Sequence, residues 1–179
     1  LAEELLAAIR RVTPQPVRYV VVTHCHADHI YGLQVFKAAG ATIVAHPAGR
    51  EYLGSDTAQL RLEASRKELA PWVDAQTRLV GADQWLAGDD VTIRLGTREV
   101  RVRHVGPAHT PEDLVVFDAQ SGVLFAGDLV FRGRVPFVGQ ADSRRWIESL
   151  TRLLEFRPRV LVPGHGPVST QAAEDLALT

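Results

Sequence analysis

The stretch between residues 23 and 29 reads THCHADH and holds three of the chain's seven histidines, its single cysteine and an aspartate. Imidazole nitrogens and carboxylate oxygens are good ligands for zinc and for other borderline divalent metals. Residues alternate along an extended loop, so His24 and His26 can share a direction while Asp28 and His29 turn toward a neighbouring point. The motif therefore predicts a metal site.

Three later segments place the same kinds of residue near glycine or proline, at the ends of apolar runs. His109 follows a run that ends at residue 105, Asp128 follows the run 123–126, and His165 follows the run 159–162. Open α/β sheets place ligand sites at the carboxyl ends of their strands. We therefore expect these residues to share a cavity with the first motif and to hold two metals about 3.5–4 Å apart. The first set would be His24, His26 and His109; the second would be Asp28, His29 and His165; Asp128 would bridge them.

The elements that must position these residues alternate between helix and strand, judged from apolar periodicity, β-branched runs and breakers. Helices are predicted over 3–12, 29–39, 47–70 and 142–156, and from residue 169. Strands are predicted over 17–22, 41–45, 77–80, 91–95, 100–105, 114–118, 123–126 and 159–162. Residues 77–80, 91–95 and 100–105 alternate apolar and polar positions, which is typical of half-exposed antiparallel strands. Without repeats or a linker, residues 1–179 are predicted to form one domain.

Composition narrows the class of partner. The 179 residues carry a formal net charge of -1, and they contain neither a basic stripe nor an aromatic platform for nucleic acid. No apolar run approaches the roughly 20 residues that span a bilayer. We therefore expect a small-molecule substrate and neither nucleic acid nor a membrane as partner.

Other residues that could do chemistry have competing interpretations. Cys25 lies between two predicted ligands, but alternation points it away from them, so a small buried filler is favoured over a nucleophile. His104 is expected to be a surface or core-edge histidine. His46 could line the pocket or support a ligand. Arg132 and Arg134 could belong to a solvated loop or could clamp an anionic substrate group.

The ordered motifs THCHADHIYG, PAHT (107–110), FAGD (125–128) and PGHG (163–166) resemble the metallo-β-lactamase superfamily. The resemblance implies an α/β fold, the αββα sandwich, with the same ligand sets for two divalent metals. Zinc is expected, with iron or manganese as alternatives. An aspartate at position 128 is similar to the glyoxalase II branch. The segment 127–137 together with GHGPV is similar to SoxH-type and quinoprotein-associated zinc metallohydrolases.

This resemblance implies a binuclear metal-dependent hydrolase in which a hydroxide held between the metals attacks a thioester, a lactone or a related ester or amide. Asp28 would be catalytic by orienting the nucleophile. Relatives in the family place a strand-rich segment before the histidine motif, whereas only 23 residues precede it here. The N-terminal strands of the first sheet are therefore expected to be missing from a truncated chain. Localisation stays open between bacterial cytoplasm and periplasm.

Two alternatives stay open at this point. The first is an oxidoreductase similar to the persulfide dioxygenases. Those enzymes use one iron, which is held by residues that match His24, His109 and Asp128 of this chain. The retention of His165 argues against it. The second is a non-catalytic metal-binding partner, which the open two-metal ligand set disfavours.

Overall fold

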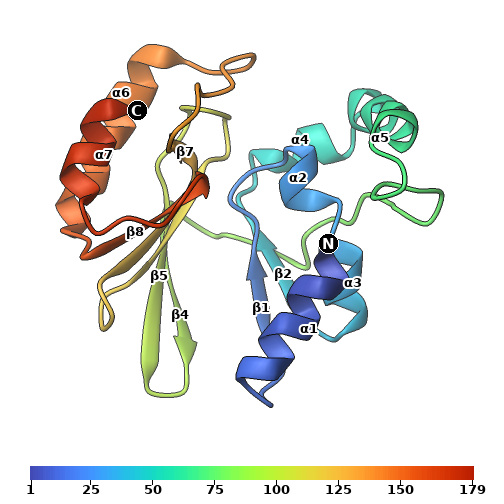
Figure 1. The fold of residues 1–179 in the computed structure, drawn as a ribbon, viewed down its shortest axis with the longest axis horizontal. Coiled ribbons are helices and arrows are strands. Elements are labelled where there is room, and N and C mark those ends of the chain that lie inside the picture. Colours follow the sequence, from blue (N-terminus) through green and yellow to red (C-terminus); the bar gives the residue numbers. More distant parts are fainter. The chain divides into compact units, whose positions relative to one another are not determined.

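The computed structural model describes residues 1–179 and divides into two compact units, Leu1–Trp85 and Leu86–Thr179. Each unit contains one β-sheet and the helices that pack on it (Figure 1). The α/β class predicted from the sequence is confirmed. The single-domain organisation stays a prediction, and the two units are described separately.

The first unit builds a three-stranded parallel sheet in the order β1-β2-β3. Tyr19 pairs with Thr42 and Val21 with Val44, so β1 and β2 end at the same edge of this sheet. Its elements are α1 (Ala2–Val12), β1 (Tyr19–Val21), α2 (Ala27–Ile30), α3 (Leu33–Ala38), β2 (Thr42–Ala45), α4 (Gly49–Leu53), α5 (Asp56–Glu68) and β3 (Gln84–Trp85).

Apolar side chains of the first unit form two neighbouring clusters. One joins the end of β1 to α2 and β2, with Ile30 and Ile43 almost fully buried. The other packs α1 against α3 through Leu6 and Phe36. The helix predicted over 3–12 is confirmed as α1, and its apolar face supplies this contact. Burial of a Leu or Phe side chain contributes about 1.5–3 kcal/mol.

The second unit builds a five-stranded sheet in the order β4-β5-β6-β7-β8. Successive pairs from β4 to β7 are antiparallel, and β8 pairs parallel to β7. Consequently β5, β7 and β8 run in one direction, and their carboxyl ends share one edge. The elements are β4 (Asp90–Leu95), β5 (Arg98–His104), β6 (Leu114–Asp118), β7 (Val123–Phe131), α6 (Ser143–Leu153), η1 (Leu154–Phe156), β8 (Val160–His165) and α7 (Ala172–Leu178).

Helices α6 and α7 cover one face of this sheet (Figure 1). Trp146 and Leu153 of α6 and Leu176 of α7 are buried against strand residues that include Leu124 and Leu161. Asp142 is the N-cap of α6, because its side chain accepts a hydrogen bond from the Arg145 backbone N–H.

Three sequence predictions are corrected. Residues 77–80 form no strand, because the Thr77 carbonyl accepts a bond from Arg66 and the Arg78 N–H donates to the Gln34 side chain. The helix predicted over 29–39 is two helices, α2 and α3, separated at Gly32, a residue with low helix propensity. The helix predicted over 47–70 is likewise divided into α4 and α5.

Strands β7 and β8 both extend farther than the sequence predicts. Asp128 lies inside β7 rather than after it, and His165 is the last residue of β8. The register between the two strands shifts on either side of Gly127, as at a β-bulge. Bulges increase local twist and re-aim side chains. None of the helices is both long and apolar enough to cross a membrane.

Candidate metal centre

The first unit carries four candidate ligands just beyond the end of β1. The ring centroids of His24 and His26 are 4.7 Å apart, and those of His24 and His29 are 4.1 Å apart. Asp28 Oδ2 lies 3.3 Å from His29 Nε2. His24 is fully buried, whereas the Asp28 side chain is 56% exposed. Both Asp28 and His29 project from the short helix α2, so a backbone turn brings all four side chains together.

Cys25 lies between two of these candidate ligands in the sequence, and it packs among apolar residues. Its side chain is buried, and its thiol donates a weak hydrogen bond to the Gly49 carbonyl over 3.8 Å. The residue belongs to the apolar cluster of the first unit. The prediction that Cys25 is a small buried filler is therefore confirmed.

The second unit gathers the other three candidate ligands. Asp128 Oδ2 lies 3.5 Å from His109 Nε2 and 3.3 Å from His165 Nε2. His109 and Asp128 are buried, and the His165 side chain is 26% exposed. The three residues meet because β5, which leads to the His109 loop, runs in the same direction as β7 and β8. The prediction that these three residues lie together is confirmed within this unit, although Asp128 lies inside β7 and not at its end.

The loop that carries His109 is tied down at several points. The carboxylate of Asp113 accepts hydrogen bonds from the backbone N–H and the hydroxyl of Thr110, each at 2.8 Å. The Ser149 hydroxyl donates to the Val105 carbonyl at 2.5 Å. The Asp142 N–H donates to the Ala108 carbonyl at 2.9 Å. Helix α6 and Asp113 thus hold the loop from both sides.

Burial raises the pKa of the Asp113 carboxyl from 3.8 to about 7, although its hydrogen bonds to Thr110 act in the opposite direction. The sequence predicts that Glu112 and Asp113 cap a turn, and the Asp113 contacts confirm a capping role for that residue. The burial of Asp113 could not be predicted from the local sequence.

Aromatic rings surround His109. The rings of Phe131, Phe137 and Trp146 meet it edge-on at centroid distances of 5.8, 6.3 and 5.2 Å. The indole N–H of Trp146 donates to the Leu129 carbonyl at 2.9 Å, one residue beyond Asp128. These contacts restrict the orientation of the imidazole ring and exclude bulk solvent from that side.

Gly164 provides the cradle for the Asp128 carboxylate. A Cβ added at Gly164 would lie 2.0 Å from Asp128 Oδ1 and 2.7 Å from the Gly127 carbonyl carbon. Only a residue without a side chain fits this position. Gly164 of the PGHG motif is therefore a part of the site. The spacing of the candidate ligands in the sequence did not predict this role.

The residues predicted to bind substrate have different surroundings. The Arg132 side chain is hydrogen-bonded within the fold, since it donates to the Asp175 carboxylate and to the carbonyls of Pro167 and Val168. Arg134 is exposed in the following loop. His46 follows β2, and its Nδ1 accepts a bond from the Ala48 N–H. A substrate contact of any of these residues stays a prediction.

His104 has the core-edge position predicted for it. The ring is half-buried, and its Nε2 lies 2.9 Å from the Pro111 carbonyl oxygen. This contact joins the end of β5 to the loop that follows His109. The residue thus acts in the packing of that loop.

The donor set fits divalent metals. Every candidate ligand is an imidazole nitrogen or a carboxylate oxygen, which are the ligands of zinc and similar ions. Ligand atoms lie within 4.8 Å of one another for His24 with His26, for Asp28 with His29, and for His109 with Asp128. In the second unit the glycine cradle leaves the carboxylate room to face both imidazoles.

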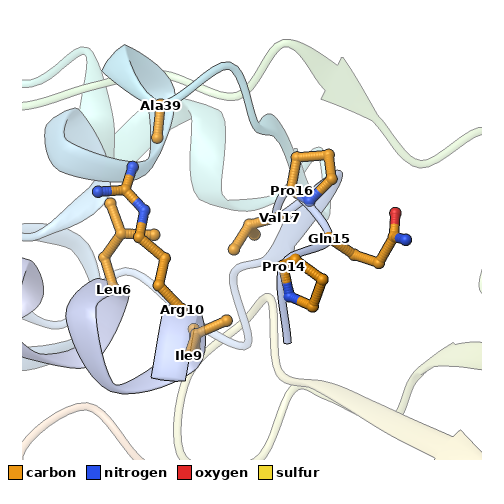
Figure 2. A pocket seen from close by; sticks show the side chains of 8 residues that line it. All are labelled: Leu6, Ile9, Arg10, Pro14, Gln15, Pro16, Val17 and Ala39. Atoms are coloured by element: carbon orange, nitrogen blue, oxygen red, sulfur yellow. The ribbon is translucent and has the colours of Figure 1, made fainter. Parts of the chain in front are cut away.

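A small pocket in the first unit lies apart from these ligands. It has a volume of about 200 Å³ and is lined by residues of α1, of the following loop and of the end of α3 (Figure 2). Its lining contains one charged residue, Arg10, and no histidine, cysteine or carboxylate. The pocket therefore offers no metal-binding chemistry.

Comparisons with known proteins bear on the same residues. A model of the metallo-beta-lactamase superfamily matches residues 1–165, which include all seven candidate ligands. The chain is 28% identical over 173 residues to the metallo-beta-lactamase type 2 of Bacillus sp. (strain 170), covering 94% of this chain and 59% of that protein. It is 30% identical over 174 residues to the acyl-coenzyme A thioesterase MBLAC2 of Gallus gallus, covering 92% and 61%.

A solved metallo-beta-lactamase from Pontibacter korlensis superposes with a TM-score of 0.71 at 27% identity, covering 98% of this chain and 75% of that structure. The chain spans about three fifths of the length of the two curated relatives named above. The finer likeness to the glyoxalase II and SoxH-type branch stays a prediction. On the family match and on this fold, the chain belongs to the metallo-β-lactamase superfamily.

Proposed function

We propose that the chain is the metal-binding part of a hydrolase that cleaves a thioester or a related ester. The observation that carries the proposal is the trio of the second unit, in which the buried Asp128 places its Oδ2 within 3.5 Å of one nitrogen of the buried His109 and one nitrogen of the partly exposed His165. Such a trio of nitrogen and oxygen donors is suited to binding a cation. Among the relatives, an acyl-coenzyme A thioesterase supports the thioester class.

The proposal assigns the candidate ligands to two ions. His24, His26 and His109 would hold one ion, and Asp28, His29 and His165 would hold the other, with Asp128 bridging them. Zinc is the expected metal. When bound, the ions supply an acidified water as nucleophile and a Lewis acid for the substrate carbonyl.

The chain's own residues have distinct tasks in this proposal. The exposed Asp28 carboxylate can accept a proton from the attacking water and orient it. His109, enclosed by aromatic rings, keeps its ring in one orientation. Asp128 lies in a buried environment, where the attraction between a carboxylate and a cation is weakly screened.

Metal analysis and a substrate panel test the proposal together. Protein purified without a metal-binding tag should contain two zinc ions per chain and should hydrolyse acyl thioesters in preference to β-lactams. An Asp28→Asn variant should lose about 10²–10⁴-fold in kcat. Glu63→Gln, on the exposed face of α5, is the matched carboxylate control and should keep full activity.

Other outcomes would refute the proposal. One iron per chain together with oxygen uptake on a persulfide would favour the oxidoreductase alternative. Two zinc ions without turnover of any thioester, lactone or β-lactam would support a non-catalytic metal-binding protein. Retention of full activity by Asp28→Asn would remove that residue from the mechanism.

A further inference from the structure

Arg132 lies four residues beyond Asp128, at the point where β8 ends. Its backbone N–H donates a 2.9 Å hydrogen bond to the carbonyl of His165. The ring of the preceding residue, Phe131, stacks on the His165 ring at a centroid distance of 5.1 Å and an angle of 21°. The end of β7 therefore contacts both the backbone and the ring of one candidate ligand.

The chain turns sharply directly after His165, and this turn packs against Arg132. Gly166 has a φ of +103°, which favours glycine. A Cβ at this position would lie 2.2 Å from the Arg132 carbonyl oxygen. The turn then returns along β8, where Ser169 and Leu161 exchange backbone hydrogen bonds of 2.8 and 2.9 Å.

The guanidinium of Arg132 fills this turn. It donates to the Pro167 carbonyl at 2.8 Å and the Val168 carbonyl at 3.2 Å. Its Nε donates to the Asp175 carboxylate on α7 at 2.8 Å, and the Asp175 side chain is only 10% exposed. A planar guanidinium can hold several oxygens at fixed angles, which an ammonium cannot do. One side chain thus ties the turn to both β7 and α7.

We propose that Arg132, held by Asp175, is a positioning residue that fixes His165 as a metal ligand, an inference that rests on the proposed two-ion site. Metal–ligand distances tolerate deviations of about 0.2 Å, so a ligand on a strand end needs such support. Nε and Nη1 of Arg132 donate within the fold, which favours this indirect role over the substrate clamp that the sequence also allowed.

The first measurement needs no metal. In ¹⁵N–¹H spectra of the histidine rings of the metal-free protein, Arg132→Lys and Asp175→Asn should shift the His165 resonances and leave those of His24 unchanged. Arg159→Lys is the matched control, because Arg159 donates to the Gln120 carbonyl at the opposite end of β8. Unchanged His165 resonances in both variants would overturn the inference.

The second measurement is metal titration monitored by a competing chelator. The two variants should weaken the binding of one ion about 10- to 100-fold and leave the other within about threefold, as expected for the loss of a group that orients a ligand. An equal loss of affinity for both ions, or a loss of affinity that follows a general fall in Tm, would also overturn the inference. If the wild-type chain binds fewer than two ions, the proposed function fails, and the histidine resonances alone decide the role of Arg132.

Discussion

Replacement of Gly164 by alanine is the sharpest test of the second-unit site. The added Cβ would lie 2.0 Å from Asp128 Oδ1, whereas ordinary contacts begin at 3.4 Å, so the carboxylate must move by about 1.4 Å. The Gly127 carbonyl group at 2.7 Å blocks the alternative of moving the new methyl group aside. Asp128 is then displaced from His109 and His165, from which it lies 3.5 and 3.3 Å.

This displacement is several times the tolerance of about 0.2 Å for a metal–ligand distance. We therefore expect Gly164→Ala to weaken metal binding by about 100-fold, which corresponds to about 2.7 kcal/mol at 1.36 kcal/mol per decade. Overpacking of a close-packed region also costs about 1–3 kcal/mol of stability in the metal-free protein. The loss of metal affinity should thus accompany a lower free energy of unfolding.

The assay is competition for zinc against a chromophoric chelator, combined with urea unfolding of the metal-free protein. Gly88→Ala is the matched control, because a Cβ at Gly88 meets nothing within 4 Å. It should keep wild-type metal affinity and stability. A folded Gly164→Ala variant that binds zinc within threefold of wild type would refute the role of Gly164 as the cradle of Asp128.

Three further predictions concern stability. Burial raises the pKa of Asp113 to about 7, so ionisation of this carboxyl costs the folded metal-free protein about 4 kcal/mol relative to the unfolded chain. The contribution of Asp113 to the free energy of unfolding is therefore fully present below about pH 4 and is lost as the pH rises through 7. Asp113→Asn should reduce the difference between the free energies of unfolding measured in urea at pH 5 and at pH 8. Trp146→Phe, which leaves the buried Leu129 carbonyl without its donor, should lower the free energy of unfolding by about 1–3 kcal/mol in the same assay. In the presence of free zinc at about 1,000 times Kd, removal of the zinc by a chelator should lower the free energy of unfolding by about 4 kcal/mol. The Tm measured by calorimetry should fall by about 8–16 °C, and an unchanged Tm would contradict metal binding to the native state.

The candidate ligands could be predicted because they interrupt apolar runs. Strand-forming residues such as those of β1 and β8 give a strong local pattern, and a histidine after such a run stands out. The exact strand ends could not be predicted. Pro163 suggests that β8 stops before this residue, because proline has no backbone N–H to donate to a neighbouring strand. However, β8 is an edge strand of its sheet, and proline is tolerated in edge strands.

The remaining errors come from contacts between residues distant in sequence. Residues 77–80 have a strand-like pattern, but their backbone groups bond to Arg66 and to Gln34, which lie 11 and 44 residues away. The partners of Arg132 lie 35 to 43 residues beyond it, so an isolated arginine in a loop could not reveal that role. Local patterns thus predict candidate ligands, but they do not predict the groups that support those residues.

The two groups of candidate ligands depend on different kinds of support. In the second unit, strand register brings Asp128 and His165 together, and the loop of His109 is held by α6 and by Asp113. In the first unit, the ligands follow a three-residue strand and sit on or before the four-residue helix α2, with Asp28 mostly exposed. A short helix contributes little stability by itself. The candidate ligands of the second unit are therefore held by more contacts within their own unit than those of the first unit.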